Sequence, residues 1–254
     1  MEGGVVLIRK AYAALRHTAP MHTLLLLPGL ACDAELFRHQ RPALERTHRV
    51  HVGDAHEHHD TLPAMAAALL AEQPGSLVLV GASMGGMLAL EIARQAPQRV
   101  RGIALLGSTA RADTPELVKL RQQACELFAA GRMDEVLRAN VLFAFHPVNA
   151  ANRGLVGDYL AMIRRAGAAQ LIRQNRAVLQ REDLRPHLAA IACPALVVVG
   201  EADGLTTPEQ SREMAALLPN ARLEIVPGAG HMLTMEQPAR VTALLLDWLA
   251  TLSA

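Results

Sequence analysis

Aromatic residues are scarce in this chain: phenylalanine, tryptophan and tyrosine together make up 3% of its 254 residues. A core for a chain of this length must then be built mainly from leucine, valine, alanine and methionine. An excess of one charge is also missing, because 25 Lys and Arg residues face 24 Asp and Glu residues. Without a basic stripe or an aromatic platform, the sequence gives no reason to expect nucleic acid as a partner.

Cysteine is rare, and long apolar runs are missing. The three cysteines, Cys32, Cys125 and Cys193, lie far apart in the sequence and form neither a disulfide framework nor a metal-binding pattern. This usage is typical of a reducing compartment, so we expect a cytoplasmic protein without a metal ion or other cofactor. No apolar run approaches the ~18–20 residues that a membrane-spanning helix needs, so no membrane partner is expected either.

The first 20 residues are predicted to be an extension that precedes the folded domain. Their apolar patch is short and is followed by Arg9 and Lys10, whereas a secretory signal places its positive charges before a longer apolar stretch. Residues 21–254 are expected to form one domain, because a chain of this length can be built around a single core. Whether residues 1–20 pack on that domain, mediate association or do neither stays open.

Short apolar runs alternate with helical patterns from residue 23 onward. This alternation predicts an α/β fold, in which a mostly parallel sheet carries helices on both faces. The expected strands cover residues 24–27, 49–52, 77–80, 100–106, 195–199 and 221–226. Around them, helices are expected at 33–44, 61–72 and 86–96, after the capping residue Thr207, and from Pro238 onward.

One long stretch interrupts this alternation. Residues from about 114 to 188 show helical patterns and no strand pattern, so we expect a helical cap inserted between two strands of the sheet. Its helices are expected at 115–130, 133–143, 152–166 and 169–180. Such an insertion would lie over the carboxyl ends of the strands, where open α/β sheets bind their ligands.

The segment Gly81-Ala82-Ser83-Met84-Gly85 lies between an apolar run and a helical pattern. Strand, Gly-x-Ser-x-Gly and helix, in this order, are the layout of a nucleophile elbow. Small residues on both sides of Ser83 would let the strand and helix backbones approach, which lifts the serine hydroxyl clear of the sheet. A plain glycine-rich turn would give the same five letters, so residues elsewhere in the chain must decide.

Two further residues have the order and spacing that an activated serine requires. A serine hydroxyl becomes a good nucleophile when a base takes its proton, and the base is usually a histidine oriented by a carboxylate. Asp203 and His231 each follow a predicted strand, in the order serine, acid, histidine. Asp203 alone could be a turn residue, His231 alone could cap a helix, and Glu201 is a rival acid. Their joint spacing favours Ser83, Asp203 and His231 as the catalytic residues.

An oxyanion hole needs two backbone N–H groups aimed at the developing negative charge. One is expected from Met84, the residue that follows the nucleophile. The other is expected from Leu30, in the loop Pro28-Gly29-Leu30 after the first strand. A simple tight turn at Pro28-Gly29 is the alternative interpretation.

A family resemblance is carried by four segments: LLLLPGL, VGASMGGMLALEIA, CPALVVVGEADGLTTP and VPGAGHMLTMEQP. With them the chain resembles an α/β-hydrolase of the small, single-domain serine esterase type. It is similar to the pimeloyl-carrier-protein methyl ester esterase, enol-lactonase and haloperoxidase-like branches. The resemblance implies Ser83 as nucleophile, His231 as base and Asp203 as the acid that orients it. Many relatives have His-Gly where this chain has Pro28-Gly29, so the wall beside the oxyanion lacks a polar ring here.

The leading hypothesis is hydrolysis of carboxylic esters of small to medium apolar substrates through an acyl-enzyme on Ser83. The same three residues could instead act on a lactone, on a carbon–carbon bond of a diketone or in peracid formation. A protein of another class, a non-catalytic ligand binder with this fold, would have no chemical need for all three. A small-molecule ester is therefore the expected partner, while the acyl group, the alcohol and the oligomeric state stay open.

Several other residues are weaker candidates for the site. Phe143, Phe145, His146 and Met232 are candidates for the substrate pocket, although packing explains them equally well. The histidines of HVGDAHEHHD could bind a metal ion, but their spacing matches no known site and a solvated surface loop is expected. Cys32 is expected to be a small packing residue and not a reactive thiol.

Overall fold

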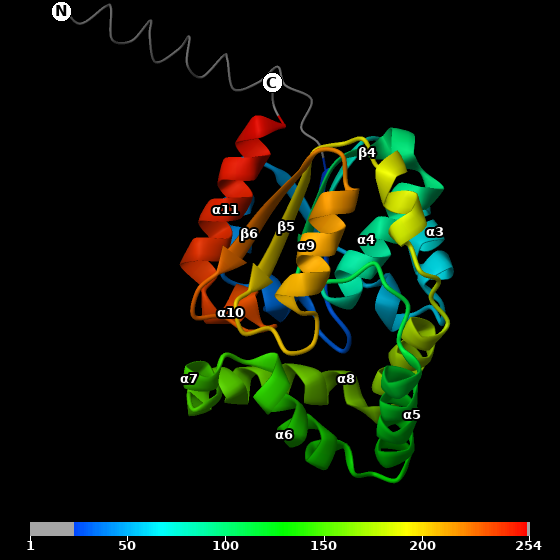
Figure 1. Cartoon of the computed structure of the whole chain (residues 1–254), viewed down its shortest axis with the longest axis vertical. Coiled ribbons are helices and arrows are strands. Elements are labelled where there is room, and N and C mark those ends of the chain that lie inside the picture. The colour runs from blue at the N-terminus through cyan, green and yellow to red at the C-terminus, as the bar shows by residue number, and fades with distance from the viewer. Residues whose placement is uncertain (1–22, 253–254) are drawn as a thin grey trace, which may run out of the picture.

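The structure, a computed structural model, describes residues 23–252, so the extension expected at 1–20 lies outside the described residues. Six strands form one sheet in the order β2-β1-β3-β4-β5-β6, and each neighbouring pair is parallel. The strands are β1 (Thr23–Leu27), β2 (Arg49–Val52), β3 (Leu77–Ala82), β4 (Val100–Leu106), β5 (Ala195–Gly200) and β6 (Ala221–Val226). All the strands visible in Figure 1 run toward the helices at the lower end of the molecule.

Helices cover both faces of this sheet. The α-helices are α2 (Arg41–Leu44), α3 (Leu62–Glu72), α4 (Met84–Gln95), α5 (Pro115–Ala129), α6 (Met133–Ala144), α7 (Pro147–Ala150), α8 (Arg153–Leu179), α9 (Pro208–Leu217), α10 (Leu233–Glu236) and α11 (Pro238–Thr251). Short 3-10 helices are η1 (Ala34–Phe37), η2 (Ala55–Glu57), η3 (Pro97–Arg99) and η4 (Arg185–Ala190). The expected α/β architecture, a parallel sheet flanked by helices, is confirmed.

The central strands read as continuous apolar runs because both of their faces are buried. Successive side chains of β3 alternate between two core clusters: Val78 and Val80 belong to one, Leu77 and Leu79 to the other. The first cluster includes the apolar stripe of α11, and the second includes side chains of α3, α4 and α9. Two-sided burial is therefore what made these strands recognisable in the sequence.

The expected strands agree with the observed ones to within two residues at each end. Thr61 caps α3 as expected, because its hydroxyl oxygen accepts a hydrogen bond from the Ala64 N–H. The last helix begins at Pro238 and buries its expected stripe: Val241, Leu244, Leu245, Trp248 and Leu249. Of the four helices expected within 114–188, the last two form one element, α8, which breaks at Gly167, where φ is 76°.

Two helix expectations were wrong in detail. A continuous helix was expected over 33–44, but the chain forms η1, a turn, and then α2. Pro42 lies in the first turn of α2, where its missing N–H costs nothing, so this helix begins at Arg41 and does not continue from η1. Thr207 precedes α9 as expected, but its side chain accepts no hydrogen bond from that helix.

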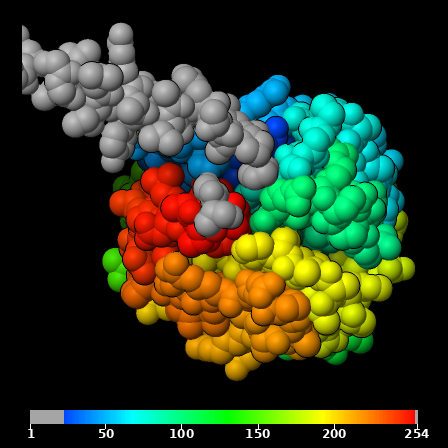
Figure 2. Space-filling view, turned by 90° about the horizontal axis from the view of Figure 1, so that it is seen from above, coloured from blue at the N-terminus to red at the C-terminus, as the bar shows by residue number. Residues whose placement is uncertain are grey.

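Helices α5 to α8, residues 115–179, are called the cap from here on. They follow β4 and precede β5, and they lie across the carboxyl ends of the strands (Figure 1). Apolar side chains of the cap, including Phe145, Tyr159 and Met162, join the core cluster on the α11 face. Figure 2, seen from above, shows the end of the molecule away from the cap, with α11 on the left and the α3–α4 side on the right.

Candidate active site

Ser83 lies at the turn between β3 and α4, with φ 54° and ψ −118°. A non-glycine residue in this region of backbone space costs on the order of 1–3 kcal/mol, so the surrounding structure must hold it there. The end of β4 supplies these restraints. The Ser83 N–H donates to the Leu106 carbonyl oxygen at 2.9 Å, and the Ser108 hydroxyl donates to the Ser83 carbonyl oxygen at 2.8 Å.

The glycines beside Ser83 are required by close backbone contacts. A Cβ atom on Gly81 would lie 2.2 Å from the carbonyl oxygen of Gly85. A Cβ atom on Gly85 would lie 1.9 Å from the carbonyl oxygen of Leu27, at the end of β1. Neither site has room for a side chain, so the elbow fixes Ser83 by steric packing of β1, β3 and α4.

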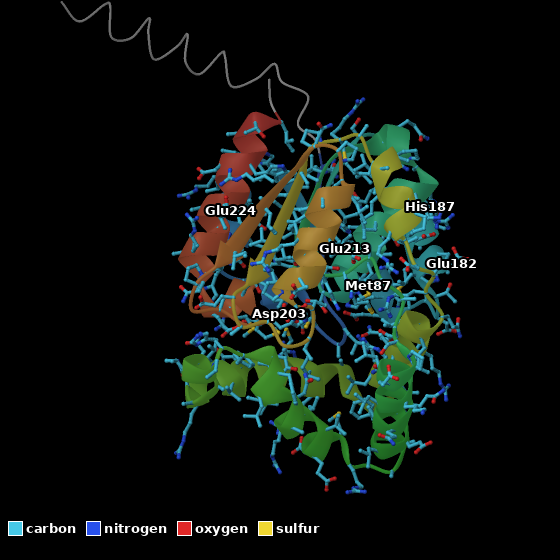
Figure 3. The ribbon with its side chains drawn as sticks, viewed as in Figure 1. Met87, Glu182, His187, Asp203, Glu213 and Glu224 are labelled. Atoms are coloured by element: carbon cyan, nitrogen blue, oxygen red, sulfur yellow. The ribbon has the colours of Figure 1, made fainter. Side chains whose placement is uncertain are left out.

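Ser83, His231 and Asp203 form one hydrogen-bonded chain. The His231 Nε2 atom lies 2.9 Å from the Ser83 Oγ atom. On the other side of the ring, His231 Nδ1 lies 2.9 Å from Asp203 Oδ2 and 3.1 Å from Asp203 Oδ1. The structure thus brings the three predicted side chains together, at the carboxyl ends of β3, β5 and β6, and Figure 3 shows Asp203 at the end of the sheet region nearest the cap.

Asp203 is clamped by its own loop. Its Oδ1 atom accepts hydrogen bonds from the N–H groups of Leu205 and Thr206, at 2.9 and 2.8 Å. The Thr206 hydroxyl donates to Asp203 Oδ2 at 3.0 Å and also lies 3.2 Å from His231 Nδ1. The sequence reasoning missed Thr206, although a hydroxyl three residues after an acid at a strand end is a readable signal. Glu201, the rival of Asp203 for the role of the acid, is about half exposed and accepts a hydrogen bond from the Gly228 N–H.

The pKa values of the acid and the base are displaced in opposite directions. Burial opposes charge on His231, but the Asp203 carboxylate and its hydrogen bond outweigh it and raise the pKa of His231 above its ordinary value. Burial likewise opposes charge on Asp203, but His231 and the N–H groups of Thr206 and Leu205 hold the pKa of Asp203 below its ordinary value. The carboxylate is therefore ionised at neutral pH, and the imidazole binds a proton more strongly than a free ring does.

Both backbone segments expected to supply oxyanion donors lie beside Ser83. A Cβ atom on Gly29 would lie 3.3 Å from the Ser83 Cβ atom, so the loop after β1 touches the elbow. Leu30 is the next residue of that loop. Met84 is the first residue of α4, and N–H groups in the first turn of a helix have no acceptor within that helix. Assignment of Leu30 and Met84 as donors stays a prediction.

The four pocket candidates lie in two different environments. Phe145 is 1% exposed and packs edge-on against Tyr159 at 5.3 Å between ring centroids, so it belongs to the cap core. Met232 is also buried, whereas Phe143 is 55% exposed. His146 lies on the connection between α6 and α7, with its Nε2 atom 3.7 Å from Glu201 Oε1. A pocket role for these four residues stays a prediction.

The end of α6 and its connection to α7 are bonded to the loops of both Asp203 and His231. Phe143 accepts a hydrogen bond from the Gly204 N–H at 3.3 Å, and Ala144 accepts one from the Met232 N–H at 3.0 Å. Glu236 completes this junction, because its carboxylate accepts hydrogen bonds from the His146 and Gly230 N–H groups, both at 2.8 Å. No local pattern in the sequence indicated Glu236, which acts between segments 90 residues apart.

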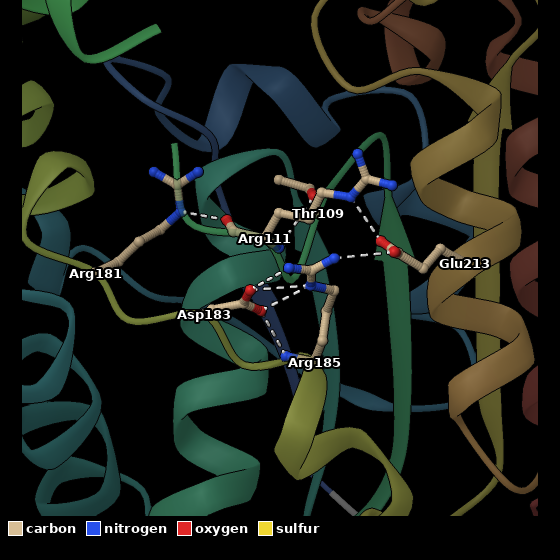
Figure 4. A network of polar contacts seen from close by, with 6 residues as sticks. All are labelled: Thr109, Arg111, Arg181, Asp183, Arg185 and Glu213. Atoms are coloured by element: carbon tan, nitrogen blue, oxygen red, sulfur yellow. Dashed lines mark hydrogen bonds and ion pairs between the residues drawn. The ribbon is translucent and has the colours of Figure 1, made fainter. Parts of the chain in front are cut away.

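The two connections between the sheet and the cap are also tied to each other (Figure 4). The first connection, residues 107–114, carries Arg111, and the second, residues 180–194, carries Arg185. Both arginines bind the Glu213 carboxylate of α9, at 2.7 and 3.1 Å. Arg181 donates to the Arg111 carbonyl oxygen at 3.0 Å. Asp113, 3% exposed, pairs with Arg181 at 2.7 Å and with Arg121 of α5 at 2.7 Å. Charged groups thus join both ends of the cap to each other and to α9.

A cavity of about 210 Å³ lies beside these connections. Its lining comes from α3, α4, the first connection and the end of α8, and it includes Met87, Glu91, Arg94, Thr109, Ala177, Arg181 and Leu184. Neither Ser83, Asp203 nor His231 lines it. The cavity is therefore separate from the hydrogen-bonded chain of the candidate active site.

The histidine-rich segment corrects one expectation. His58 is exposed, as a surface loop would have it, but His56 is 2% exposed, so a solvated loop was the wrong prediction for this residue. Within residues 23–252, no group of His, Cys, Asp and Glu side chains could hold a metal ion. Cys32 is buried, and burial, followed by the charge of Asp33, raises the pKa of its thiol to about 12, in keeping with a packing role. No helix of the described residues is long and apolar enough to span a membrane.

Comparison with known proteins agrees with this fold. A family model described as the alpha/beta hydrolase fold matches residues 22–238. A pimeloyl-(acyl-carrier protein) methyl ester esterase of Edwardsiella ictaluri is 30% identical over 242 residues, which cover 89% of this chain and 92% of the relative. A putative carbamate hydrolase, RutD of Serratia proteamaculans, is 28% identical over 89% of this chain and 90% of its own. A malate-bound thermophilic esterase from Thermogutta terrifontis superposes with a TM-score of 0.83 at 27% identity, covering 93% and 92% of the two chains.

Proposed function

The chain belongs to the α/β-hydrolase family and is a hydrolase, and from this premise we propose that it is a serine esterase. Its proposed substrates are carboxylic esters of small to medium apolar compounds. The observation that carries the proposal is the continuous hydrogen-bonded chain from Ser83 Oγ through the His231 ring to Asp203. An esterase-named relative at 30% identity supports ester hydrolysis over other reactions of this family.

The proposed reaction begins with attack of Ser83 Oγ on the ester carbonyl carbon, while His231 Nε2 takes the hydroxyl proton. Asp203 holds the Nδ1–H group of the ring, which fixes the tautomer with a free Nε2 lone pair and stabilises the imidazolium that forms. The carbonyl oxygen becomes an oxyanion that accepts hydrogen bonds from the N–H groups of Leu30 and Met84. Collapse of this intermediate expels the alcohol, which leaves with the proton that His231 held.

Water completes the turnover. His231 takes a proton from a water molecule as its oxygen attacks the acyl carbon on Ser83, and the same oxyanion donors act again. The second intermediate expels the Ser83 oxygen, which recovers its proton from His231, and the carboxylic acid is released. Two acyl transfers therefore use one base and one pair of donors, and no cofactor takes part in the proposed cycle.

The decisive experiment removes the nucleophile. Ser83→Ala is expected to abolish hydrolysis of p-nitrophenyl butyrate, a loss of at least ~10⁴-fold in kcat, and labelling by a fluorophosphonate probe. Ser211→Ala is the matched control, because it removes a fully buried serine hydroxyl on α9 that has no hydrogen-bond partner among residues 23–252. This control should keep wild-type turnover and labelling, with circular dichroism showing that both variants are folded.

Two outcomes would contradict the proposal. Wild-type-like turnover by folded Ser83→Ala would exclude Ser83 as the nucleophile. Absence of both labelling and ester turnover in folded wild-type protein would favour a non-catalytic binder with this fold. A panel of esters of increasing acyl length, with lactones alongside, would then separate ester from lactone hydrolysis.

A further inference from the structure

The loop that carries Leu30 has a conformation that its own sequence does not explain. Ala31 adopts φ 56°, a left-handed conformation. This conformation is unfavourable for any residue that carries a Cβ atom. Within the loop, one hydrogen bond closes the turn, from the Cys32 N–H to the Gly29 carbonyl oxygen at 3.0 Å. Because Leu30 lies inside this turn, the direction of its N–H depends on whatever holds Ala31 and Cys32 in place.

Gln174, a cap residue on α8, holds one side of the turn. Its Oε1 atom accepts the Ala31 N–H at 2.6 Å, and its Nε2 atom donates to the His56 carbonyl oxygen at 2.8 Å. A flipped amide would set donor against donor and acceptor against acceptor, so these two partners permit one orientation. Gln174 is completely buried, which makes both hydrogen bonds hard to replace with water.

His56 holds the other side of the turn. Its Nε2 atom lies 2.8 Å from the Cys32 carbonyl oxygen, which can only accept, so Nε2 carries the proton. Burial lowers the pKa of His56, against the opposing effect of that hydrogen bond, which keeps the ring neutral near pH 7. His56 and Gln174 are bonded to each other, so Ala31, Cys32, His56 and Gln174 form one buried polar network across segments far apart in sequence.

We infer that Gln174 and His56 are positioning residues, which hold the loop 29–32 so that the Leu30 N–H points at the substrate oxyanion. The inference rests on the proposed function and deepens it. Gln174 belongs to the cap, while Ser83 belongs to the sheet, so one of the two oxyanion donors depends on where the cap lies. The network would make full catalytic power conditional on a seated cap.

The test replaces Gln174 by a residue of similar length that cannot form hydrogen bonds. Gln174→Met is expected to lower kcat for p-nitrophenyl butyrate by ~10- to 100-fold, because loss or misplacement of one oxyanion donor costs on the order of 10²-fold. The KM should stay within about twofold. The rate of fluorophosphonate labelling should fall by a factor similar to that of kcat, because the phosphoryl oxygen uses the same donors.

Asn175→Leu is the matched control for lost stability. Asn175 is buried on the same helix, and its side chain bonds to the Leu171 carbonyl oxygen and to Arg121, not to the loop 29–32. Its replacement should lower the melting temperature as Gln174→Met does, while kcat and the labelling rate stay within about twofold of wild type. A purely structural role for Gln174 would instead give the two variants the same kinetics.

A pair of His56 variants tests the second arm of the network and serves if Gln174→Met does not fold. The His56→Gln amide can present an N–H at the reach of Nε2 and should retain most of the activity, whereas His56→Leu should lose it as Gln174→Met does. Wild-type kcat and labelling rate in folded Gln174→Met, or equal kinetics of the two His56 variants, would overturn the inference. Failure of the proposed function can be told apart from failure of this inference. In the first case the wild-type protein itself would show no fluorophosphonate labelling.

Discussion

The central strands of the sheet are buried on both faces, whereas the cap joins the rest of the molecule through polar groups as well as through apolar side chains. Every residue of β3 and β5 is buried. In contrast, Phe128 is the only buried residue among the 15 residues of α5. Arginine–carboxylate pairs bridge the cap and the sheet region: Arg38–Asp158, at 2.6 Å, and Arg165–Asp33, at 2.8 Å.

The sheet and the cap therefore hold the residues of the candidate active site in different ways. Ser83 is held by backbone contacts that leave no space for one more carbon atom, so its position is a property of packing. Beside its apolar contacts, the cap is held by ion pairs and hydrogen bonds at its two connections and at its junction with Glu236, each of which can be lost separately. Substitutions in the sheet should therefore decide whether the protein folds, and those in the cap should adjust how well the site works.

The largest effect is expected from one methyl group at the elbow. Gly85→Ala sets a Cβ atom 1.9 Å from the Leu27 carbonyl oxygen, so β1 and α4 must separate and the free energy of unfolding should fall by at least ~3 kcal/mol. Gly157→Ala is the matched change in the cap, where a Cβ atom would meet nothing within 4 Å. The free energy of unfolding of Gly157→Ala should rise by about 0.5–1 kcal/mol. Urea denaturation measures the unfolding free energy of both variants. Equal stability of the two variants would contradict the contrast between the packed elbow and the cap.

A smaller loss is expected at the junction of cap and sheet. Asp113→Asn leaves Arg181, 7% exposed, without its buried carboxylate, so unfolding free energy should fall by about 3 kcal/mol. Burial opposes the charge of Asp113, but Arg181 and Arg121 lower its pKa. Its stabilising effect is therefore present above the unfolded pKa of ~3.9 and is lost as pH falls through the folded value.

Thermal unfolding between pH 3 and pH 7 checks this prediction. The difference in melting temperature between wild type and Asp113→Asn should shrink as the pH falls. Glu135→Gln is the control, since its partner Arg132 is 56% exposed and Glu135 itself is 59% exposed. Exposed pairs contribute little, so this variant should stay close to wild type. A constant difference across the pH range would show that the Asp113 carboxylate is not the cause.

The same contrast explains how much could be predicted from the sequence. β1, β3 and β5 were predicted to within two residues because burial on both faces makes each one a continuous apolar run. Ser83, Asp203 and His231 could be found because each follows a predicted strand, and the carboxyl ends of parallel strands lie at the same edge of the sheet. Their proposed roles were therefore readable from local pattern and chain order alone.

The polar junctions could not be predicted in this way. Gln174 bonds to Ala31 across 143 residues, and nothing near either residue marks the contact. His56 lies in a run of charged and polar residues whose composition indicates solvent, yet its ring is buried against the Cys32 carbonyl oxygen. Hydrogen bonds between distant segments leave no periodic trace, so a single sequence does not disclose them.

The smallest effect concerns the pH dependence of His231, at the boundary of sheet and cap. Because the pKa of His231 is raised and the proposed base must be neutral, the acid limb of kcat/KM should have its midpoint above ~6.5. The stabilising effect of that raised pKa is fully present below the unfolded pKa and is lost as pH rises through the folded one. The ion pair with Asp203 is therefore weakest in the pH range where the enzyme is most active.

Glu236 allows a stricter test, because its carboxylate contributes to raising the pKa of His231 and also accepts a hydrogen bond from the His146 N–H of the cap. Glu236→Gln removes the charge, so the midpoint of the acid limb should move to lower pH by a fraction of a unit. Loss of folded protein would lower the height of the profile but not its midpoint. Glu224→Gln is the matched control, since Glu224 on β6 lies far from Asp203 in Figure 3 and should leave the midpoint unchanged. Equal midpoints in all three proteins would show that the Glu236 carboxylate has no influence on the proposed base.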